Sequence, residues 1–197
     1  MNARPAVFLD RDGTLNEAVP DPDSGIPESP LQVSEVHLID GAAAAARRLA
    51  DAGFALVCVT NQPAAAKGKV PVEQLLAVHD RVLELLREQG VQLDASRLCV
   101  HHPEGVVPEL TGPCACRKPA PGMLLETAQE LRLALGDSWM VGDTDTDVAA
   151  GRAAGCRTVL IEYPPSAHKR SEDAGANLLA GDLADGVAQL LRQCSSR

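Results

Sequence analysis

The chain alternates between short apolar runs and longer segments in which apolar and polar positions repeat at helical spacing. The apolar runs have the length of strands and cover residues 6–9, 54–59, 97–100, 139–141 and 157–161. The helical segments cover residues 41–53, 71–89, 123–135 and 147–154, and a last strand and helix are expected within 177–193. This alternation predicts an α/β fold with a parallel sheet, and the length predicts a single domain over residues 1–197.

Polar side chains stand where several apolar runs end. Asp10 follows the first run, Thr60 and Asn61 follow the second, and Asp143 follows the fourth. The carboxyl ends of parallel strands share one edge of a sheet, and catalytic groups gather there. These four residues are therefore expected to meet in one site.

Two carboxylates, Asp10 and Asp12, follow the first apolar run directly. In an extended chain they point to one side, and two carboxylates that face one point need a cation such as Mg²⁺. One carboxylate can attack phosphorus to form an aspartyl-phosphate while the other transfers protons. The pair therefore predicts phosphoryl-transfer catalysis. The alternative is a simple turn, because Asp-Gly is a common turn dipeptide.

Three thiols and one imidazole lie at the two ends of the loop 99–116, which overlaps an irregular stretch over residues 101–121. Cys99 and His101 open the loop, and Cys114 and Cys116 close it. Such a ligand set forms closed structural zinc sites, and a metal can cross-link a loop that has little core of its own. The spacing predicts a structural Zn²⁺ site, with His102 as a less favoured alternative to His101. The other interpretation is a group of buried thiols without a metal.

Composition excludes several classes of protein. The chain has 197 residues, a net charge of -9 and only 2% aromatic residues, which disfavours binding to nucleic acid or to an anionic membrane. We find no apolar stretch of membrane-spanning length and no signal-peptide pattern at the start of the sequence. The expectation is a cytoplasmic protein, monomeric, whose six cysteines are thiols or metal ligands.

The segment after the first apolar run resembles the first signature of the haloacid dehalogenase superfamily of phosphatases: Asp10-Arg11-Asp12-Gly13-Thr14. The resemblance implies a Rossmann-like fold, with Asp10 as the nucleophile and Asp12 as the general acid and base. It also implies a Mg²⁺ ion held by the Asp10 side chain and the Asp12 backbone carbonyl.

Three further segments resemble the remaining signatures in the same order. Thr60 resembles the second signature and Lys118, ahead of a predicted helix, resembles the third. Asp143 resembles the fourth and is the expected third ligand of Mg²⁺. Asp147 is expected either to support the site or to favour the start of its helix, and Asp145 is expected to face solvent. The Lys118 ammonium is expected to offset charge on the transferring phosphoryl group.

A narrower resemblance covers residues 99–103, 114–119 and 121–125, which read CVHHP, CACRKP and PGMLL. These segments are similar to the D-glycero-D-manno-heptose 1,7-bisphosphate 7-phosphatases and to the related histidinol-phosphatase branch. The resemblance implies a minimal cap, a zinc-bound loop and hydrolysis of the 7-phosphate of a small sugar bisphosphate. The expected phosphate- and substrate-binding residues are Thr60, Asn61, Gln62, Arg117 and Lys118.

Two segments depart from the heptose enzymes. Pro63 and Ala64 stand where those enzymes continue with Ser-Gly, and residues 16–40 form a longer, proline-rich loop. Both segments lie beside the expected site, so histidinol phosphate or another small phosphomonoester is an alternative substrate. The alternatives from other classes are a non-catalytic phosphoacceptor module, which does not need Asp12, and a zinc-dependent hydrolase.

Overall fold

The computed structural model describes residues 3–21, 24–171 and 173–195. Its strands are β1 (Ala6–Leu9), β2 (Val19–Pro20), β3 (Pro27–Glu28), β4 (Ala55–Asn61), β5 (Ala95–Cys99), β6 (Trp139–Gly142), β7 (Arg157–Ile161) and β8 (Leu178–Ala180). Its α-helices are α1 (Ala42–Asp51), α2 (Val72–Glu88), α3 (Gly122–Leu131), α4 (Asp145–Ala153) and α5 (Leu183–Ser195). Every strand and helix that the periodicity predicts has a counterpart among these elements.

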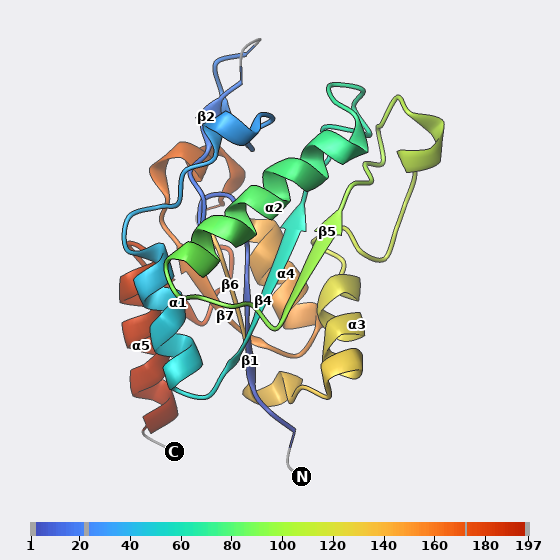
Figure 1. Ribbon diagram of the computed structural model, residues 1–197. Helices are drawn as coiled ribbons and strands as arrows, with labels where there is room; N and C mark the ends of the chain where they lie inside the picture. The colour runs from blue at the N-terminus through green and yellow to red at the C-terminus, as the bar shows by residue number, and fades with distance from the viewer. Residues whose placement is uncertain (1–2, 22–23, 172, 196–197) are drawn as a thin grey trace.

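Six strands form one parallel sheet in the order β5-β4-β1-β6-β7-β8 (Figure 1). From β1 the chain moves outward through β4 and β5, and it then crosses to the other side of β1 for β6, β7 and β8. This reversal creates a topological switch point, where open α/β sheets place their ligands. The predicted Rossmann-like parallel sheet is confirmed.

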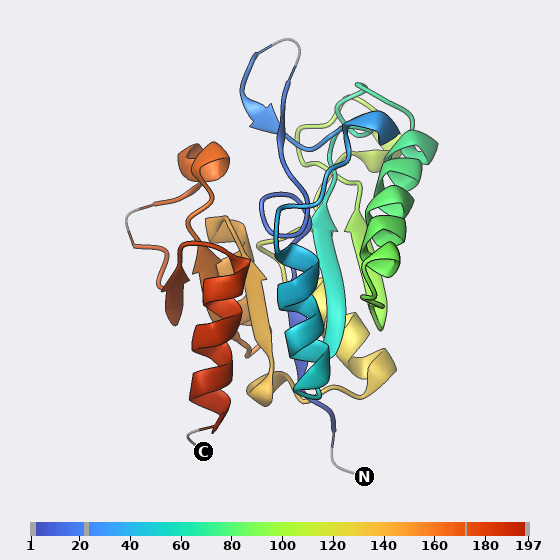
Figure 2. The ribbon, with the colours of Figure 1, turned by 60° about the vertical axis from the view of Figure 1, so that its left-hand side comes forward.

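Helices cover both faces of the sheet (Figure 2), and alternate residues of the central strand pack in the two cores that result. Val7 and Leu9 pack in a core with α1, α2 and α5, whereas Ala6 and Phe8 pack in a core with α3 and α4. All four side chains are fully buried. A strand covered on both faces needs an uninterrupted apolar run, which explains why residues 6–9 contain no polar residue.

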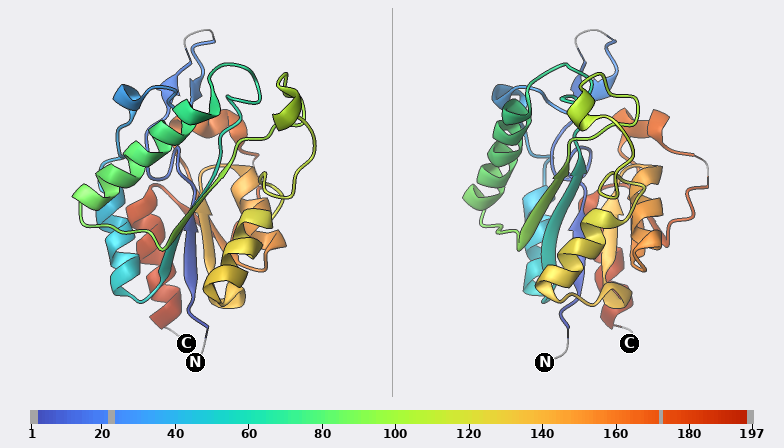
Figure 3. Two further views of the ribbon diagram at one scale, coloured as in Figure 1. Left: turned by 45° about the vertical axis from the view of Figure 1, so that its right-hand side comes forward. Right: turned by 90° about the vertical axis from the view of Figure 1, so that its right-hand side faces the viewer.

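The carboxyl edge of the sheet carries the irregular parts of the chain (Figure 3). The antiparallel β2–β3 hairpin rises above this edge, together with the 3₁₀ helix η4 (Pro164–Lys169) and the loop that follows β5. These short segments stand in place of a cap domain, as the resemblance implied.

None of the helices in the described ranges combines the length and apolar character of a membrane span.

One helix boundary is wrong in the sequence-based prediction. α3 stops before residue 135, because Arg132 adopts a left-handed conformation with φ of 56°. The Leu133 N–H then bonds the Ala128 carbonyl at 2.8 Å and ends the helix. The following chain pairs with the segment before β1, where the Ala134 N–H bonds the Arg4 carbonyl at 2.9 Å.

His79 is expected to make the fold sensitive to acid. This residue lies on the buried face of α2 and its ring shares a hydrogen bond with Ser96. Burial, and then the nearby charge of Arg11, lowers the pKa of His79 from 6.5 to about 4. Because the folded pKa lies below the unfolded one, the neutral ring stabilises the fold above pH 6.5, and this contribution is lost as the pH falls toward 4.

We therefore expect the free energy of unfolding to fall by about 2 kcal/mol more in the wild type than in His79→Gln between pH 7 and pH 5. Urea denaturation of both proteins at the two pH values measures this difference. Equal pH dependence in the two proteins would show that His79 titrates normally in the folded state.

Candidate active site

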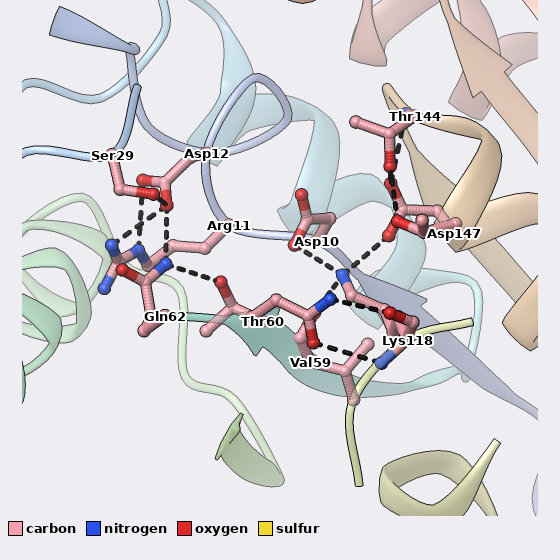
Figure 4. A network of polar contacts seen from close by, with 12 residues as sticks. Asp10, Arg11, Asp12, Ser29, Val59, Thr60, Gln62, Lys118, Thr144 and Asp147 are labelled. Atoms are coloured by element: carbon pink, nitrogen blue, oxygen red, sulfur yellow. Dashed lines mark hydrogen bonds and ion pairs between the residues drawn. The ribbon is translucent and has the colours of Figure 1, made fainter. Parts of the chain in front are cut away.

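Lys118 lies at the centre of a buried carboxylate cluster (Figure 4). Its Nζ donates to Asp10 Oδ1 at 2.6 Å and to the Val59 carbonyl at 2.7 Å, and it forms an ion pair with Asp147 Oδ1 at 2.6 Å. Asp10 follows β1, Val59 lies in β4 and Asp147 lies in the first turn of α4. The switch point therefore brings together groups from four distant parts of the chain.

Negative charge exceeds positive charge in this cluster. Asp10, Asp143 and Asp147 have carboxylate oxygens within 4.8 Å of one another. Burial raises the pKa of Asp10 well above its ordinary value; the Lys118 ammonium opposes this shift, and the charges of Asp147 and Asp143 add to it. Burial and the charge of Asp147 raise the pKa of Asp143 to about 6. Burial lowers the pKa of Lys118, but the charges of Asp10 and Asp147 outweigh this effect and raise it overall.

The donor set fits a small divalent cation. Asp143 Oδ1 is buried and has no hydrogen-bond partner among the described residues. Mg²⁺ binds carboxylate and carbonyl oxygens and would offset the excess negative charge. Asp147 stands in the cluster in addition to the expected ligands Asp10 and Asp143, whereas the Asp12 side chain lies outside it.

The position of Asp12 in an extended chain had predicted a carboxylate beside that of Asp10, but the Asp12 side chain lies outside the cluster. β1 ends at Leu9, and the chain then turns, with the N–H of Leu15 bonding the Arg11 carbonyl at 2.8 Å. The Asp12 carboxylate instead faces the fully buried Arg11 guanidinium, at 2.9 and 3.1 Å (Figure 4). Burial raises the pKa of Asp12, but the charge of Arg11 and several hydrogen bonds outweigh it and lower the pKa below its ordinary value.

Glycine is required at two points of the site. Gly13 has φ of 83°, and a Cβ there would lie 2.1 Å from Asp143 Oδ2. A Cβ on Gly142 would lie 2.3 Å from Cγ of Asp147. The absence of these two side chains lets the carboxylates approach the end of β1.

Asn61 and Gln62 use their amides within the protein. The Asn61 side chain donates to the Lys118 carbonyl at 2.9 Å and accepts from the Lys118 N–H at 3.1 Å. Gln62 Nε2 donates to Asp12 at 2.7 Å and to Thr60 Oγ1 at 2.8 Å. This geometry favours supporting roles for both amides, where the sequence had predicted binding of phosphate or substrate.

A pocket of about 310 Å³ opens above the cluster. Asp10, Asp12, Thr60, Asn61, Arg117, Lys118 and Asp143 line it, so most of the predicted site residues meet there. Lys67 and Lys169 add positive charge at its wall. Sequence reasoning missed these two lysines because no motif surrounds them. It also placed Asp145 in solvent, whereas this side chain is partly buried and accepts the Ser171 N–H at 2.8 Å.

The four predicted zinc ligands converge at the end of β5. Sγ of Cys116 lies 3.0 Å from that of Cys99 and 3.3 Å from that of Cys114, and 3.5 Å from Nδ1 of His101. Tetrahedral zinc with Zn–S bonds of about 2.3 Å has ligand separations of roughly 3.5–3.8 Å, so the cluster is slightly contracted and fits this ion. His102 lies outside the cluster and accepts the Glu104 N–H at 3.1 Å.

Comparisons with known proteins agree with the fold. A family model described as HAD-hydrolase-like matches residues 115–186. A crystal structure titled as a HAD-like phosphatase from Mesorhizobium loti has a TM-score of 0.80 and 34% identity, covering 100% of this chain and 88% of that one. Fold and site together define a hydrolase of the haloacid dehalogenase class.

Similar proteins of known name indicate which family within this class the chain belongs to. A D-glycero-β-D-manno-heptose-1,7-bisphosphate 7-phosphatase from Yersinia pestis is 39% identical over 181 residues, or 92% of each chain. The enzyme of the same name from Escherichia coli K12 is 39% identical, over 92% of this chain and 91% of its own. A D,D-heptose 1,7-bisphosphate phosphatase from B. bronchiseptica, solved with magnesium and phosphate, has a TM-score of 0.77 and 30% identity, covering 96% of this chain and 99% of that one. The chain belongs to this family of HAD-like phosphatases.

Proposed function

We propose that this protein hydrolyses the 7-phosphate of D-glycero-β-D-manno-heptose 1,7-bisphosphate. The observation that carries the proposal is 39% identity, over 92% of the chain, to an enzyme named for that reaction. The chemistry is supported by the buried Asp10 and Lys118 at the switch point of the sheet. One hydrophobic core runs from Val7 to Leu190, which supports a single phosphatase domain over residues 1–197.

In the proposed reaction, an Asp10 oxygen attacks the 7-phosphorus, and the bond from phosphorus to the sugar oxygen breaks. The electron pair stays on that oxygen, which takes a proton from Asp12. Water then attacks the phosphorus of the aspartyl-phosphate and gives a proton to Asp12, and the Asp10 carboxylate is released. Lys118 lies 2.6 Å from Asp10 and offsets charge on the phosphoryl oxygens, and the Thr60 hydroxyl lines the same pocket as a further donor.

Asp10, Asp143 and the Asp12 carbonyl are the proposed holders of Mg²⁺, which supplies positive charge to the phosphoryl group when bound. Support comes from the buried, unpartnered Asp143 Oδ1 and from the excess of carboxylates in the cluster. Zn²⁺ is proposed at Cys99, His101, Cys114 and Cys116 as a structural ion, since four protein ligands leave no position for water.

The pocket suits a substrate with a second anionic group. Lys67, Arg117 and Lys169 line it in addition to Lys118, and Lys169 pairs there with Glu28. Arg117 Nη1 also donates to the His101 carbonyl at 3.3 Å, so the zinc loop helps to position it. A bisphosphate uses such a cationic wall better than a monophosphate does.

Phosphate release in the presence of Mg²⁺ tests the proposal. The panel contains both anomers of the heptose 1,7-bisphosphate, histidinol phosphate and fructose 1,6-bisphosphate. We expect kcat/KM for the β anomer to exceed the others by about 10-fold or more. A higher kcat/KM for histidinol phosphate would support the proposed phosphatase chemistry but contradict the proposed substrate. No release from any compound would contradict the proposed function.

A further inference from the structure

The Asp12 carboxylate is surrounded by hydrogen-bond donors. Arg11 donates twice, at 2.9 and 3.1 Å, and Asn16 Nδ2 donates at 3.1 Å. Gln62 Nε2 donates at 2.7 Å and the Ser29 hydroxyl at 2.8 Å. All of these contacts come from donors, so Asp12 is held as an acceptor in one orientation at the wall of the pocket.

Ser29 lies on a different structural element from the other donors to Asp12. Arg11 and Asn16 belong to the turn after β1, and Gln62 follows β4, so the sheet positions all three. Among the described donors to Asp12, Ser29 is the one that comes from the hairpin segment, directly after β3. Its hydroxyl therefore links the position of the hairpin to the orientation of Asp12.

Two ion pairs anchor the hairpin to other elements. Glu28, next to Ser29, pairs with Lys169 of η4 at 2.8 Å. Asp21, directly after β2 on the outgoing side of the hairpin, pairs with Lys69 from the loop after β4. These anchors fix the segment that carries Ser29, although the side chains of Glu28 and Lys169 are themselves partly exposed.

We propose that Ser29 is a positioning residue for Asp12 and that it acts in the hydrolysis of the aspartyl-phosphate. This inference rests on the proposed function. In that step a water oxygen bonds to phosphorus, the bond from phosphorus to the Asp10 oxygen breaks, and the water proton passes to Asp12. Donors on both Asp12 oxygens fix the orientation of the carboxylate at the wall of the pocket, where it takes that proton. The transfer of the phosphoryl group onto Asp10 from a good leaving group needs little help from Asp12.

Ser29→Ala is expected to slow hydrolysis of the intermediate by about fivefold, because one of several hydrogen bonds to a charged group is lost. With p-nitrophenyl phosphate, kcat and KM should fall together while kcat/KM stays within about twofold. Stopped-flow measurements should show a burst of p-nitrophenol that approaches one equivalent per site. Ser29→Thr, which keeps the hydroxyl, should restore the wild-type kinetics.

Ser24→Ala is the matched control, because Ser24 lies on the same hairpin and its hydroxyl bonds Asp21 rather than Asp12. It should leave kcat within about twofold of the wild type. Glu28→Gln should give a weaker form of the Ser29→Ala effect, and no further loss when combined with it.

Unchanged kcat in Ser29→Ala, or a fall in kcat/KM without a burst, would overturn the role of Ser29. A wild-type enzyme that releases no phosphate would instead overturn the proposed function.

Discussion

Asp10→Asn is expected to abolish phosphate release, with a loss of about 10⁴-fold or more. An amide oxygen is a far weaker nucleophile than a carboxylate, and no other described side chain holds the same place against Lys118. The measurement is phosphate release with Mg²⁺ from the substrate that the wild type prefers. Asp51→Asn, on the exposed end of α1, provides the matched control and should keep full activity.

The same substitution should not destabilise the protein. Burial raises the pKa of Asp10, so its ionised form costs folding free energy at neutral pH, and this cost grows as the pH rises above the ordinary value of 3.8. Asparagine removes that cost and leaves Lys118 paired with Asp147. In the absence of Mg²⁺, the Tm of Asp10→Asn should equal or exceed that of the wild type. A lower Tm would show that Asp10 stabilises the fold and would contradict the excess of negative charge inferred for the cluster.

Cys116→Ser is expected to remove zinc and to destabilise the protein by about 3 kcal/mol or more. Three ligands from two segments hold the ion poorly, and the loop 99–116 has few buried apolar side chains to replace the cross-link. Activity should fall as well, because Arg117 and Lys118 follow Cys116 directly and lose their support. Metal analysis, thermal denaturation and phosphate release are the measurements.

Cys194→Ser controls for loss of a thiol, since Cys194 is exposed and lies outside the cluster. It should keep both zinc and stability. A zinc-free Cys116→Ser protein with unchanged Tm would show that the metal does not stabilise the loop. A zinc-free protein that stays folded and has lost all activity would indicate a catalytic zinc instead.

The charge balance of the site explains why it depends on several elements at once. Three carboxylates approach one another around a single lysine, and the glycines at 13 and 142 allow the approach. Such a cluster stores unfavourable electrostatic energy, which the rest of the fold must offset. Stability is therefore expected to be highest when the cation is bound.

Many features of this protein could be predicted from its sequence, because they depend on residues that lie close together in the chain. The apolar run before Asp10 and the apolar residues of β4 and β6 show strands buried on both faces, and the alternation with helices predicts the parallel sheet. The Cys-x-His and Cys-x-Cys spacings predict their convergence, since each pair needs only a short stretch of backbone to present its ligands. Lys118 and Asp143 were predicted from motifs whose residues are adjacent in the chain.

Tertiary structure alone decided the remaining contacts, because they join residues distant in sequence. Gln62 donates to Asp12 across 50 positions of the chain, a contact that the extended-chain argument could not foresee. Ser29 reaches Asp12 only through the path of the hairpin, and Asn61 reaches Lys118 across 57 positions of the chain. Such contacts depend on where the sheet and its loops place each backbone segment, and local periodicity carries no information about that placement.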